Sequence, residues 1–297
     1  MPGASNLAPV PVDRACGKRL CSRDMDQLEE LRNRAAAMRR HILRMIHASG
    51  TAGHYGGSLS CVEILACLFF RHMNHEPGNP RWPDRDRFVL SKGHAAPALY
   101  AALAEAGYFP MEHLDTFKRF GSILQGHPDM HLTPGVEMST GSLGQGLSAA
   151  LGMALAMRLD ARGSRVYVLL GDGELDEGSV WEAAMAAAHH RVHSLTAILD
   201  RNLLQVSGPT EASMRLEPVA AKWQAFGWEV FAVDGHDPAG ILEALRGANE
   251  VRDKPSMIIA RTVKGKGLPA LEGQTACHSC TLTEVQFSEA MGRLGEC

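Results

Sequence analysis

The stretch that decides the fold of this 297-residue chain is Leu169-Leu170-Gly171-Asp172-Gly173-Glu174-Leu175-Asp176-Glu177-Gly178. It joins an apolar run typical of a strand to a Gly-Asp-Gly turn, and a helix is expected to begin after Gly178. This order places the carboxylate of Asp172 at the carboxyl end of the strand, where Gly171 and Gly173 let a ligand approach the backbone closely. Such a turn also occurs on ordinary protein surfaces, so the rest of the chain must distinguish a site from a loop.

Apolar runs of strand type occur on both sides of this stretch, with helical patterns between them. Continuous apolar strands that alternate with amphipathic helices predict a parallel sheet covered on both faces. We therefore expect an α/β fold, a doubly wound, mainly parallel sheet with helices on both faces. The expected strands are 88–90, 165–170, 195–199, 229–233 and 256–260, and the expected helices include 25–48, 180–190, 218–226, 239–249, one ending near 107 and one ending near 158.

The beginning of the second helical pattern carries a start signal. Ser60 precedes an apolar run and Glu63 follows three residues later, which is the spacing of a capping box. We expect Ser60 to cap this helix, and Cys61 and Cys67 to lie buried on it as small hydrophobic residues. The segment Cys277-His278-Ser279-Cys280 superficially resembles a metal knuckle, but a structural zinc site usually needs a second such pair.

The composition is that of an ordinary globular protein, with 45% hydrophobic and 21% charged residues. A formal net charge of −3 without a basic stripe disfavours nucleic acid as a partner. No apolar run reaches the roughly 20 residues of a membrane-spanning helix, so no membrane association is expected. We expect residues 1–24 to form a disordered tail rather than a secretory signal, residues 25–297 to form a single domain, and the protein to be cytoplasmic with reduced thiols.

A second polar segment follows the next expected strand. It reads Leu199-Asp200-Arg201-Asn202-Leu203-Leu204. If the two strands are neighbours, Asp172 and Asn202 face one crevice beyond the carboxyl ends of the sheet. A carboxylate, an amide oxygen and a backbone carbonyl suit a hard cation such as Mg²⁺, which keeps its remaining positions for water and diphosphate oxygens.

Four further segments, together with this metal motif, resemble the transketolase family in sequence and in order. They are residues 49–58 (Ser-Gly-Thr-Ala-Gly-His-Tyr-Gly-Gly-Ser), 86–94 (Asp-Arg-Phe-Val-Leu-Ser-Lys-Gly-His), 126–128 (Gly-His-Pro) and 140–146 (Thr-Gly-Ser-Leu-Gly-Gln-Gly). The resemblance covers roughly residues 40 to 280 and implies the first domain of that family, a thiamin-diphosphate-binding fold. It also implies a transferase that moves a two-carbon ketol (glycolaldehyde) unit from a ketose phosphate to an aldose acceptor, with thiamin diphosphate and Mg²⁺ (or Ca²⁺ or Mn²⁺) as cofactors.

The same resemblance implies roles for individual positions. The metal ligands would be Asp172, Asn202 and the carbonyl of Leu204. The other cofactor-binding positions would be Gly141, Ser142 and Leu143 beside the aminopyrimidine and the diphosphate, Gly171 and Gly173 around the metal ligand, and Glu177 at the subunit junction.

Four histidines resemble the catalytic histidines of the substrate channel: His54, His94, His127 and His278, of which His94 and His278 also bind the cofactor. An imidazole, with an unperturbed pKa of about 6.5, can accept and return protons near neutral pH. We expect His54 and His278 to handle protons, and His94 and His127 to position the donor hydroxyls and the diphosphate. Stabilisation of the carbanion itself belongs to the cofactor.

Full-length transketolases carry two more domains, one of which holds the glutamate that activates the cofactor. Only about twenty residues follow the expected first domain here, too few for either domain. The resemblance therefore implies a partner, a C-terminal transketolase subunit with the pyrimidine-binding and C-terminal domains. We expect an α2β2 heterotetramer that acts on sugar phosphates.

Other interpretations remain open at this stage. Cys277 and Ser279 flank His278 where the family usually has an aromatic residue and a glycine, so the two-carbon unit could go to a non-standard acceptor, such as a modified sugar or a carrier-bound group. A 2-oxoacid dehydrogenase or a deoxyxylulose-phosphate synthase shares the metal motif, but the histidines and the 141–146 segment disfavour both. A non-catalytic scaffold is disfavoured by the intact Asp172 and Asn202.

Overall fold

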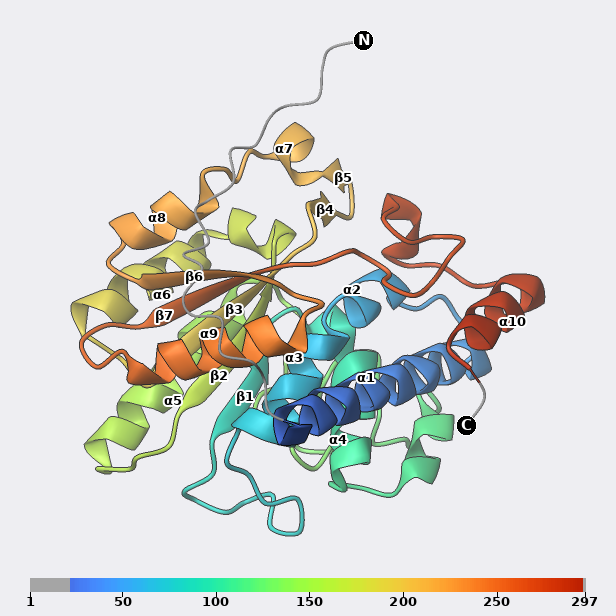
Figure 1. The fold of residues 1–297 in the computed structure, drawn as a ribbon, viewed down its shortest axis with the longest axis horizontal. Coiled ribbons are helices and arrows are strands. Elements are labelled where there is room, and N and C mark those ends of the chain that lie inside the picture. The colour runs from blue at the N-terminus through green and yellow to red at the C-terminus, as the bar shows by residue number, and fades with distance from the viewer. Residues whose placement is uncertain (1–21, 296–297) are drawn as a thin grey trace.

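A computed structural model of the chain describes residues 22–295. Its centre is a five-stranded sheet in the order β1-β2-β3-β7-β6, with every neighbouring pair parallel (Figure 1). These strands are β1 (Arg87–Leu90), β2 (Val166–Gly171), β3 (Leu195–Arg201), β6 (Glu229–Asp234) and β7 (Ser256–Arg261). The expected strands and their parallel arrangement are confirmed.

Helices cover both faces of the sheet (Figure 1). Side chains of β2 alternate between two apolar cores, because successive residues of a strand point to opposite faces. The first core includes α1 (Ser22–Ala48), α3 (Val62–Cys67), α4 (Ala96–Ala106) and α9 (Pro238–Glu250), and the second includes α5 (Gln145–Leu159), α6 (Gly178–His189) and α8 (Val219–Ala225). The doubly wound α/β fold is therefore confirmed.

Shorter elements complete the described chain. A two-stranded hairpin, β4 (Leu204–Gln205) and β5 (Gly208–Pro209), follows β3 directly and so lies at the carboxyl end of the sheet (Figure 1). The remaining helices are α2 (Tyr55–Leu59), η1 (Leu68–His72), η2 (Gly93–Ala95), η3 (Met111–Thr116), η4 (Gly173–Asp176), α7 (Thr210–Ser213), η5 (Thr275–Cys277) and α10 (Glu284–Arg293). Within residues 22–295, no helix combines the length and apolarity that crossing a membrane requires.

The capping box expected at Ser60 is wrong. Helix α2 ends at Leu59 and α3 begins at Val62, so Ser60 lies between the two helices. Its hydroxyl donates instead to the buried carboxylate of Asp200 (2.6 Å). Glu63 forms an ion pair with Arg39 (2.6 Å). Charged partners distant in the sequence have replaced the local bonds that the capping pattern predicts.

The boundary of the expected disordered tail also differs. Helix α1 begins at Ser22, so the last three residues of the segment 1–24 are helical. Residues 1–21 lie outside the described chain. The expected burial of Cys61 and Cys67 is confirmed, and both thiols are free.

The sheet register brings the two polar segments together. Gly171 at the end of β2 pairs with Asp200 in the neighbouring β3. Asp172 and Asn202 therefore follow adjacent strands at the same edge, as expected. Loops after β1 and β7 reach this edge as well, because all five strands run in the same direction.

We expect Trp223→Ala to destabilise the fold. Trp223 is fully buried in the second core, with its ring centroid 4.9 Å from that of Trp228 and 5.3 Å from that of Trp181. Removing a buried tryptophan costs about 3–5 kcal/mol through lost burial and the cavity left behind. The thermal midpoint measured by circular dichroism should fall on the order of 10 °C for a chain of this size. Met185→Ala, at an exposed position of α6, is the control; similar midpoints for both variants would contradict the packing described.

Candidate functional site

A cavity of about 240 Å³ lies at the carboxyl edge of the sheet. It is lined mainly by residues from the loops that follow β1, β2, β3 and β7. Most of the expected cofactor and metal positions lie in its wall: His94, Gly141, Leu143, Gly171, Asp172, Gly173, Asn202, Leu204 and His278. The structure therefore brings together residues that are more than 180 positions apart in the sequence.

The carboxylate of Asp172 is buried in this wall. It accepts hydrogen bonds from the Leu203 N–H (2.6 Å) and from the Arg201 guanidinium (3.2 Å). Burial raises the pKa of Asp172 to about 6, and the nearby negative charge of Asp200 adds to the effect. A cation beside Asp172 would stabilise its ionised form, because an opposite charge lowers the pKa of a carboxyl group.

Asn202 and Leu204, which line the same cavity as Asp172, offer two more oxygen atoms. The Asn202 amide oxygen accepts from the Leu204 N–H (3.2 Å), and the Leu204 carbonyl accepts from the Lys264 ammonium (3.0 Å). A set made of carboxylate, amide and carbonyl oxygens is the kind that Mg²⁺ or Ca²⁺ prefers. The chemistry of the wall thus fits the hard cation expected there.

Glycine keeps the cavity open at two points. A Cβ atom at Gly57 would come within 3.0 Å of Nε2 of His94, and one at Gly173 would come within 2.8 Å of the Gln205 Cβ. A side chain at Gly173 would collide with Gln205, and one at Gly57 would crowd the His94 ring. The cavity is nevertheless smaller than the roughly 300–1,000 Å³ of sites that enclose a whole drug-sized ligand.

The cavity wall also holds a buried ion pair that the sequence analysis missed. The Lys92 ammonium contacts the Asp200 carboxylate (2.5 Å) and donates to the Gly57 carbonyl (2.7 Å), while Ser60 and Thr262 donate to the same carboxylate. Burial opposes both charges, but the mutual attraction is stronger. It raises the pKa of Lys92 and lowers the pKa of Asp200. Lys92 follows β1 by two residues, and Asp200 lies near the end of β3. A charged residue at the end of a strand is the one sequence signal that could have indicated this pair.

Glu174, also missed, anchors the glycine-rich loop of residues 141–144. Its buried carboxylate accepts from the Gly144 N–H (2.8 Å), the Gly171 N–H (3.0 Å) and the Ser91 hydroxyl. Gly144 has φ +81°, and a Cβ there would come within 2.5 Å of the Ser179 hydroxyl oxygen, so only glycine fits. The loop is thereby fixed against the end of β2.

Two expected positions lie near the cavity but do not line it. Ser142 is exposed between Gly141 and Leu143, which do line the wall. Glu177 immediately precedes α6 and is exposed. Their roles at the cofactor and at a subunit junction stay predictions.

The four expected histidines form one cluster beside the cavity. His54 is central: its ring centroid lies 5.3 Å from that of His94, 5.5 Å from that of His278 and 6.4 Å from that of His127. The ring centroids of His94 and His278 are 5.2 Å apart. His94 and His278 line the cavity, and His127 lies against Gly141 of its wall.

Burial keeps these imidazoles neutral near pH 7. Desolvation lowers the pKa of His54 to about 4 and that of His278 to about 4, and nearby lysines act in the same direction. The pKa values of His94 and His127 are lowered for the same principal reason. Nδ1 of His278 is buried and has no hydrogen-bond partner within residues 22–295, so it can serve a bound ligand.

An isolated β-bridge brings two distant parts of the chain to this cluster. Gly53 and Cys280 exchange both backbone hydrogen bonds (2.9 and 3.1 Å). His54 directly follows Gly53, and His278 precedes Cys280 by two residues. A Cβ at Gly53 would collide with the Ile46 side chain, so the close approach to α1 requires glycine.

Lys264 is a further residue of the wall that the sequence analysis missed. Its neighbours in the chain are fixed on both sides: the Val263 N–H donates to Nε2 of His236 (2.9 Å), and the Lys266 carbonyl accepts from Arg39 (3.2 Å). Arg39 and His236 in turn share the carboxylate of Glu63. This network directs the Lys264 ammonium into the cavity, and burial lowers its pKa. Gly265 and Gly267 follow β7 closely, and these glycines could have indicated a functional loop around Lys264.

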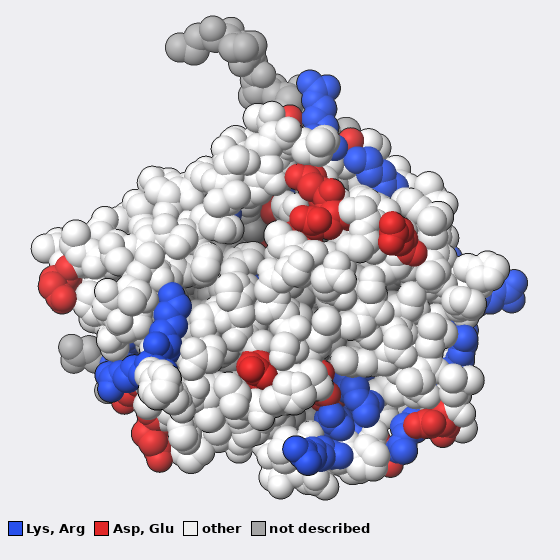
Figure 2. Space-filling view, turned by 180° about the vertical axis from the view of Figure 1, so that it is seen from behind, with Lys and Arg blue, Asp and Glu red and all other residues white. Residues whose placement is uncertain are grey.

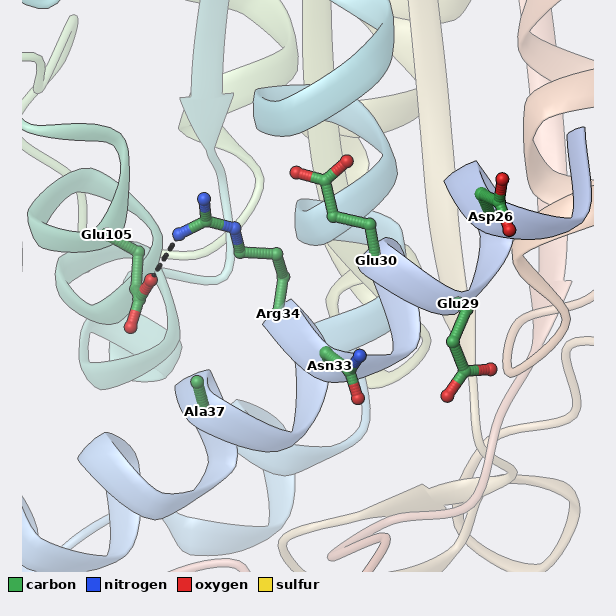
Figure 3. Close-up of a pocket in the computed structure, with 7 residues that line it drawn as sticks. All are labelled: Asp26, Glu29, Glu30, Asn33, Arg34, Ala37 and Glu105. Atoms are coloured by element: carbon green, nitrogen blue, oxygen red, sulfur yellow. Dashed lines mark hydrogen bonds and ion pairs between the residues drawn. The ribbon is translucent and has the colours of Figure 1, made fainter. Parts of the chain in front are cut away.

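A second hollow lies along α1, away from the expected site residues (Figure 3). Its volume is about 470 Å³, and it is lined mainly by acidic side chains, with one ion pair between Arg34 and Glu105 (2.8 Å). An open acidic surface of this kind is typical of a solvated helix face. The cavity at the sheet edge is therefore the candidate active site.

Comparisons with known proteins agree with this geometry. Residues 32–296 match the family described as transketolase, thiamine diphosphate binding domain. The chain is 49% identical to the 6-deoxy-6-sulfo-D-fructose transketolase subunit SqwG of Clostridium sp. strain MSTE9, over 91% of this chain and 98% of that protein. It is 42% identical to one of the apulose-4-phosphate transketolase subunits, that of Phocaeicola vulgatus, over 91% of this chain and 95% of that protein.

Solved structures extend the match to three dimensions. Transketolase from Campylobacter jejuni superposes with a TM-score of 0.84 at 35% identity, covering 90% of this chain and 43% of that one. Transketolase from Leishmania mexicana superposes with a TM-score of 0.85 at 33% identity, covering 89% of this chain and 41% of that one. This chain thus spans about two fifths of these solved enzymes, although it covers nearly all of the relatives that are called subunits. The chain belongs to the transketolase family, whose thiamin diphosphate-binding domain it carries.

Proposed function

We propose that this chain is one subunit of a two-chain transketolase that transfers a glycolaldehyde unit from a ketose phosphate to an aldose acceptor. The observation that carries the proposal is the cluster of four neutral histidines beside a wall of oxygen ligands. A site for a metal-bound diphosphate alone would not require the histidines. Transfer of a ketol unit requires groups that move protons on and off sugar hydroxyls.

The cavity wall would hold the cofactor's charged end. Asp172, Asn202 and the Leu204 carbonyl would bind Mg²⁺ (or Ca²⁺ or Mn²⁺), and Lys264 would neutralise part of the diphosphate charge. Thiamin diphosphate, when bound, would supply the thiazolium ring that stabilises negative charge on the donor fragment. No carboxylate of residues 22–295 forms an ion pair with Lys264, which leaves its charge available for phosphate oxygens.

The histidines would handle the protons of the sugar. His54 and His278 are neutral, so each can accept the proton that leaves the donor hydroxyl when the carbon–carbon bond breaks. The same nitrogen can return a proton to the acceptor oxygen afterwards. His94 and His127 would hold the donor hydroxyls in place, because the rings of both lie next to that of His54.

A partner chain would complete the site, as a C-terminal transketolase subunit in an α2β2 assembly. The cavity is too small for the whole cofactor, so the aminopyrimidine would lie against another chain. Helix α5 supports this idea: its solvent-facing side includes Ser148, Gly152 and Ala156, and the helix carries one charged residue. Figure 2 shows a face on which charged side chains are sparse, with a hollow beside a group of carboxylates.

A non-standard sugar is the second candidate for the substrate. The two relatives compared above are named for modified sugars, 6-deoxy-6-sulfo-D-fructose and apulose 4-phosphate. Cys277 and Ser279 flank His278 here, where the family usually has an aromatic residue and a glycine. Cys277 is buried, and its Sγ packs against Gly56 and Gly265 beside the histidine.

We expect Asp172→Ala in the two-chain complex to abolish Mg²⁺-dependent retention of thiamin diphosphate. The variant lacks the carboxylate that holds the bridging cation. Calorimetric titration with thiamin diphosphate, with and without Mg²⁺, measures the effect. Asp176→Ala is the matched control, since Asp176 is an exposed carboxylate four residues away. Unchanged cofactor affinity in Asp172→Ala would place the metal elsewhere.

We expect His54→Ala to retain cofactor affinity and to lower kcat for donor cleavage on the order of 10²–10⁴-fold, the typical contribution of an acid–base group. Single-turnover kinetics with a ketose phosphate measures the loss. His131→Ala, at an exposed histidine, should behave like the wild type. Normal turnover by His54→Ala would remove this residue from the reaction.

We expect the purified chain alone, with thiamin diphosphate and Mg²⁺, to show no sugar transfer. Its cavity lacks the groups that would contact the rest of the cofactor. Adding the product of a neighbouring transketolase-like reading frame should restore transfer, and chromatography with light scattering should give the mass of two copies of each chain. Robust transfer by the single chain would refute the split enzyme.

A further inference from the structure

A buried guanidinium lies beside the expected metal ligand. Arg201, the last residue of β3, is only 4% exposed. Two of its N–H groups donate to the Asp172 carboxylate (3.2 Å) and the Thr210 hydroxyl (2.9 Å). Two more donate to the carboxylates of Glu211 (3.2 Å) and Glu217 (3.0 Å). One side chain therefore connects the end of β2 to α7 and to the loop that follows α7.

The same side chain also fixes the turn that carries the other two expected ligands, Asn202 and Leu204. Leu203, which lies between them, has φ +69°, a left-handed conformation that is uncommon for a residue with a Cβ. Its N–H donates to the Asp172 carboxylate (2.6 Å), and its carbonyl accepts from the Thr210 N–H (3.0 Å). Such a conformation persists where the surrounding structure fixes it. The two residues that hold this turn are both bonded to the guanidinium.

The charges around Arg201 permit a cation nearby. A guanidinium alone would repel a divalent cation bound to the same carboxylate. Arg201, however, forms ion pairs with Glu211 and Glu217 as well as with Asp172, so negative charge exceeds positive charge around it. The two glutamates can keep the guanidinium in place when a cation shares the Asp172 carboxylate. Arg201 therefore need not leave for a metal to bind.

We propose that Arg201 is a positioning residue of the metal site, which holds the Asp172 carboxylate and the turn after β3 in the geometry that Mg²⁺ requires. The inference rests on the proposed function and concerns how its cation is selected. Mg²⁺ demands near-ideal octahedral geometry, whereas Ca²⁺ accepts a flexible ligand set. Groups that hydrogen-bond to ligating carboxylates typically contribute roughly 10–100-fold to metal affinity. Loss of Arg201 should therefore weaken Mg²⁺ binding more than Ca²⁺ binding.

The test is Arg201→Met in the two-chain complex saturated with thiamin diphosphate, titrated calorimetrically with Mg²⁺ and, separately, with Ca²⁺. We expect Mg²⁺ affinity to fall roughly 10- to 100-fold and Ca²⁺ affinity to fall less, so that the ratio of the two affinities decreases. Arg201→Lys keeps the charge without the planar fork of donors, and should show the same lowered ratio. Arg215→Met, at an exposed arginine between Glu211 and Glu217, is the matched control and should behave like the wild type.

Thr210→Val probes the same contact without removing a buried charge. It deletes one acceptor of the guanidinium, so Mg²⁺ affinity should fall roughly fivefold, the effect of one hydrogen bond, again with a smaller change for Ca²⁺. This variant decides the question if Arg201→Met does not assemble, because an unchanged ratio in Thr210→Val would also contradict the proposal.

The outcomes separate this inference from the proposed function. Equal decreases for both cations in Arg201→Met, or no decrease for either, would overturn the positioning role, because a merely structural contact does not distinguish Mg²⁺ from Ca²⁺. Recovery of the wild-type ratio by Arg201→Lys would show that charge alone is needed, and would overturn it as well. Full Mg²⁺ affinity in Asp172→Ala would instead overturn the metal site of the proposed function. Loss of the cation in Asp172→Ala, with a wild-type ratio in Arg201→Met, would remove only this inference.

Discussion

The buried ion pair between Lys92 and Asp200 is the constraint on which the rest of the site depends. Two charges removed from water are costly unless each meets the other and further hydrogen bonds complete them. Here the Gly57 carbonyl, Ser60 and Thr262 supply those bonds. The pair thereby fixes the loop after β1, the end of β3, the loop after β7 and helix α2 relative to one another. These four segments, together with the loop after β2 and residues 141–143, surround the cavity.

Much of the fold follows from local patterns. The apolar strands could be located because strands buried on both faces of a parallel sheet read as continuous apolar runs. The meeting of Asp172 and Asn202 was predictable too, since parallel neighbours end at one edge. The positions of the four histidines relative to one another came from a family resemblance, and the structure brings their rings into one cluster.

Contacts between residues far apart in the chain could not be predicted from the sequence. Ser60 and Glu63 show the capping spacing, but each side chain meets a charged partner from another element, and those partners prevail over the local pattern. Lys92 and Asp200 are separated by 108 positions, so no window of sequence displays them as a pair. Glu174 lies within the most informative stretch of the chain, yet its role depends on where the 141–144 loop folds.

The division of the site between two chains that we propose also has a physical basis. This chain alone builds a complete sheet with two apolar cores, and its cavity holds the oxygen ligands and the histidines. Fold alone does not specify a reaction, and the chemistry here depends on particular side chains at one edge of the sheet. Those side chains suit the charged end of a cofactor and the protons of a sugar.

The bridge between Gly53 and Cys280 bears on how such enzymes diversify. His278 lies on a segment with little regular structure, and two backbone hydrogen bonds tether that segment beside His54. Exchanges of the residues around His278 can therefore shift one imidazole while the sheet and the metal wall keep their shape. Under the proposed function, changes at residues 277–280 would alter the histidine side of the cavity more than the sheet edge that carries Asp172 and Asn202.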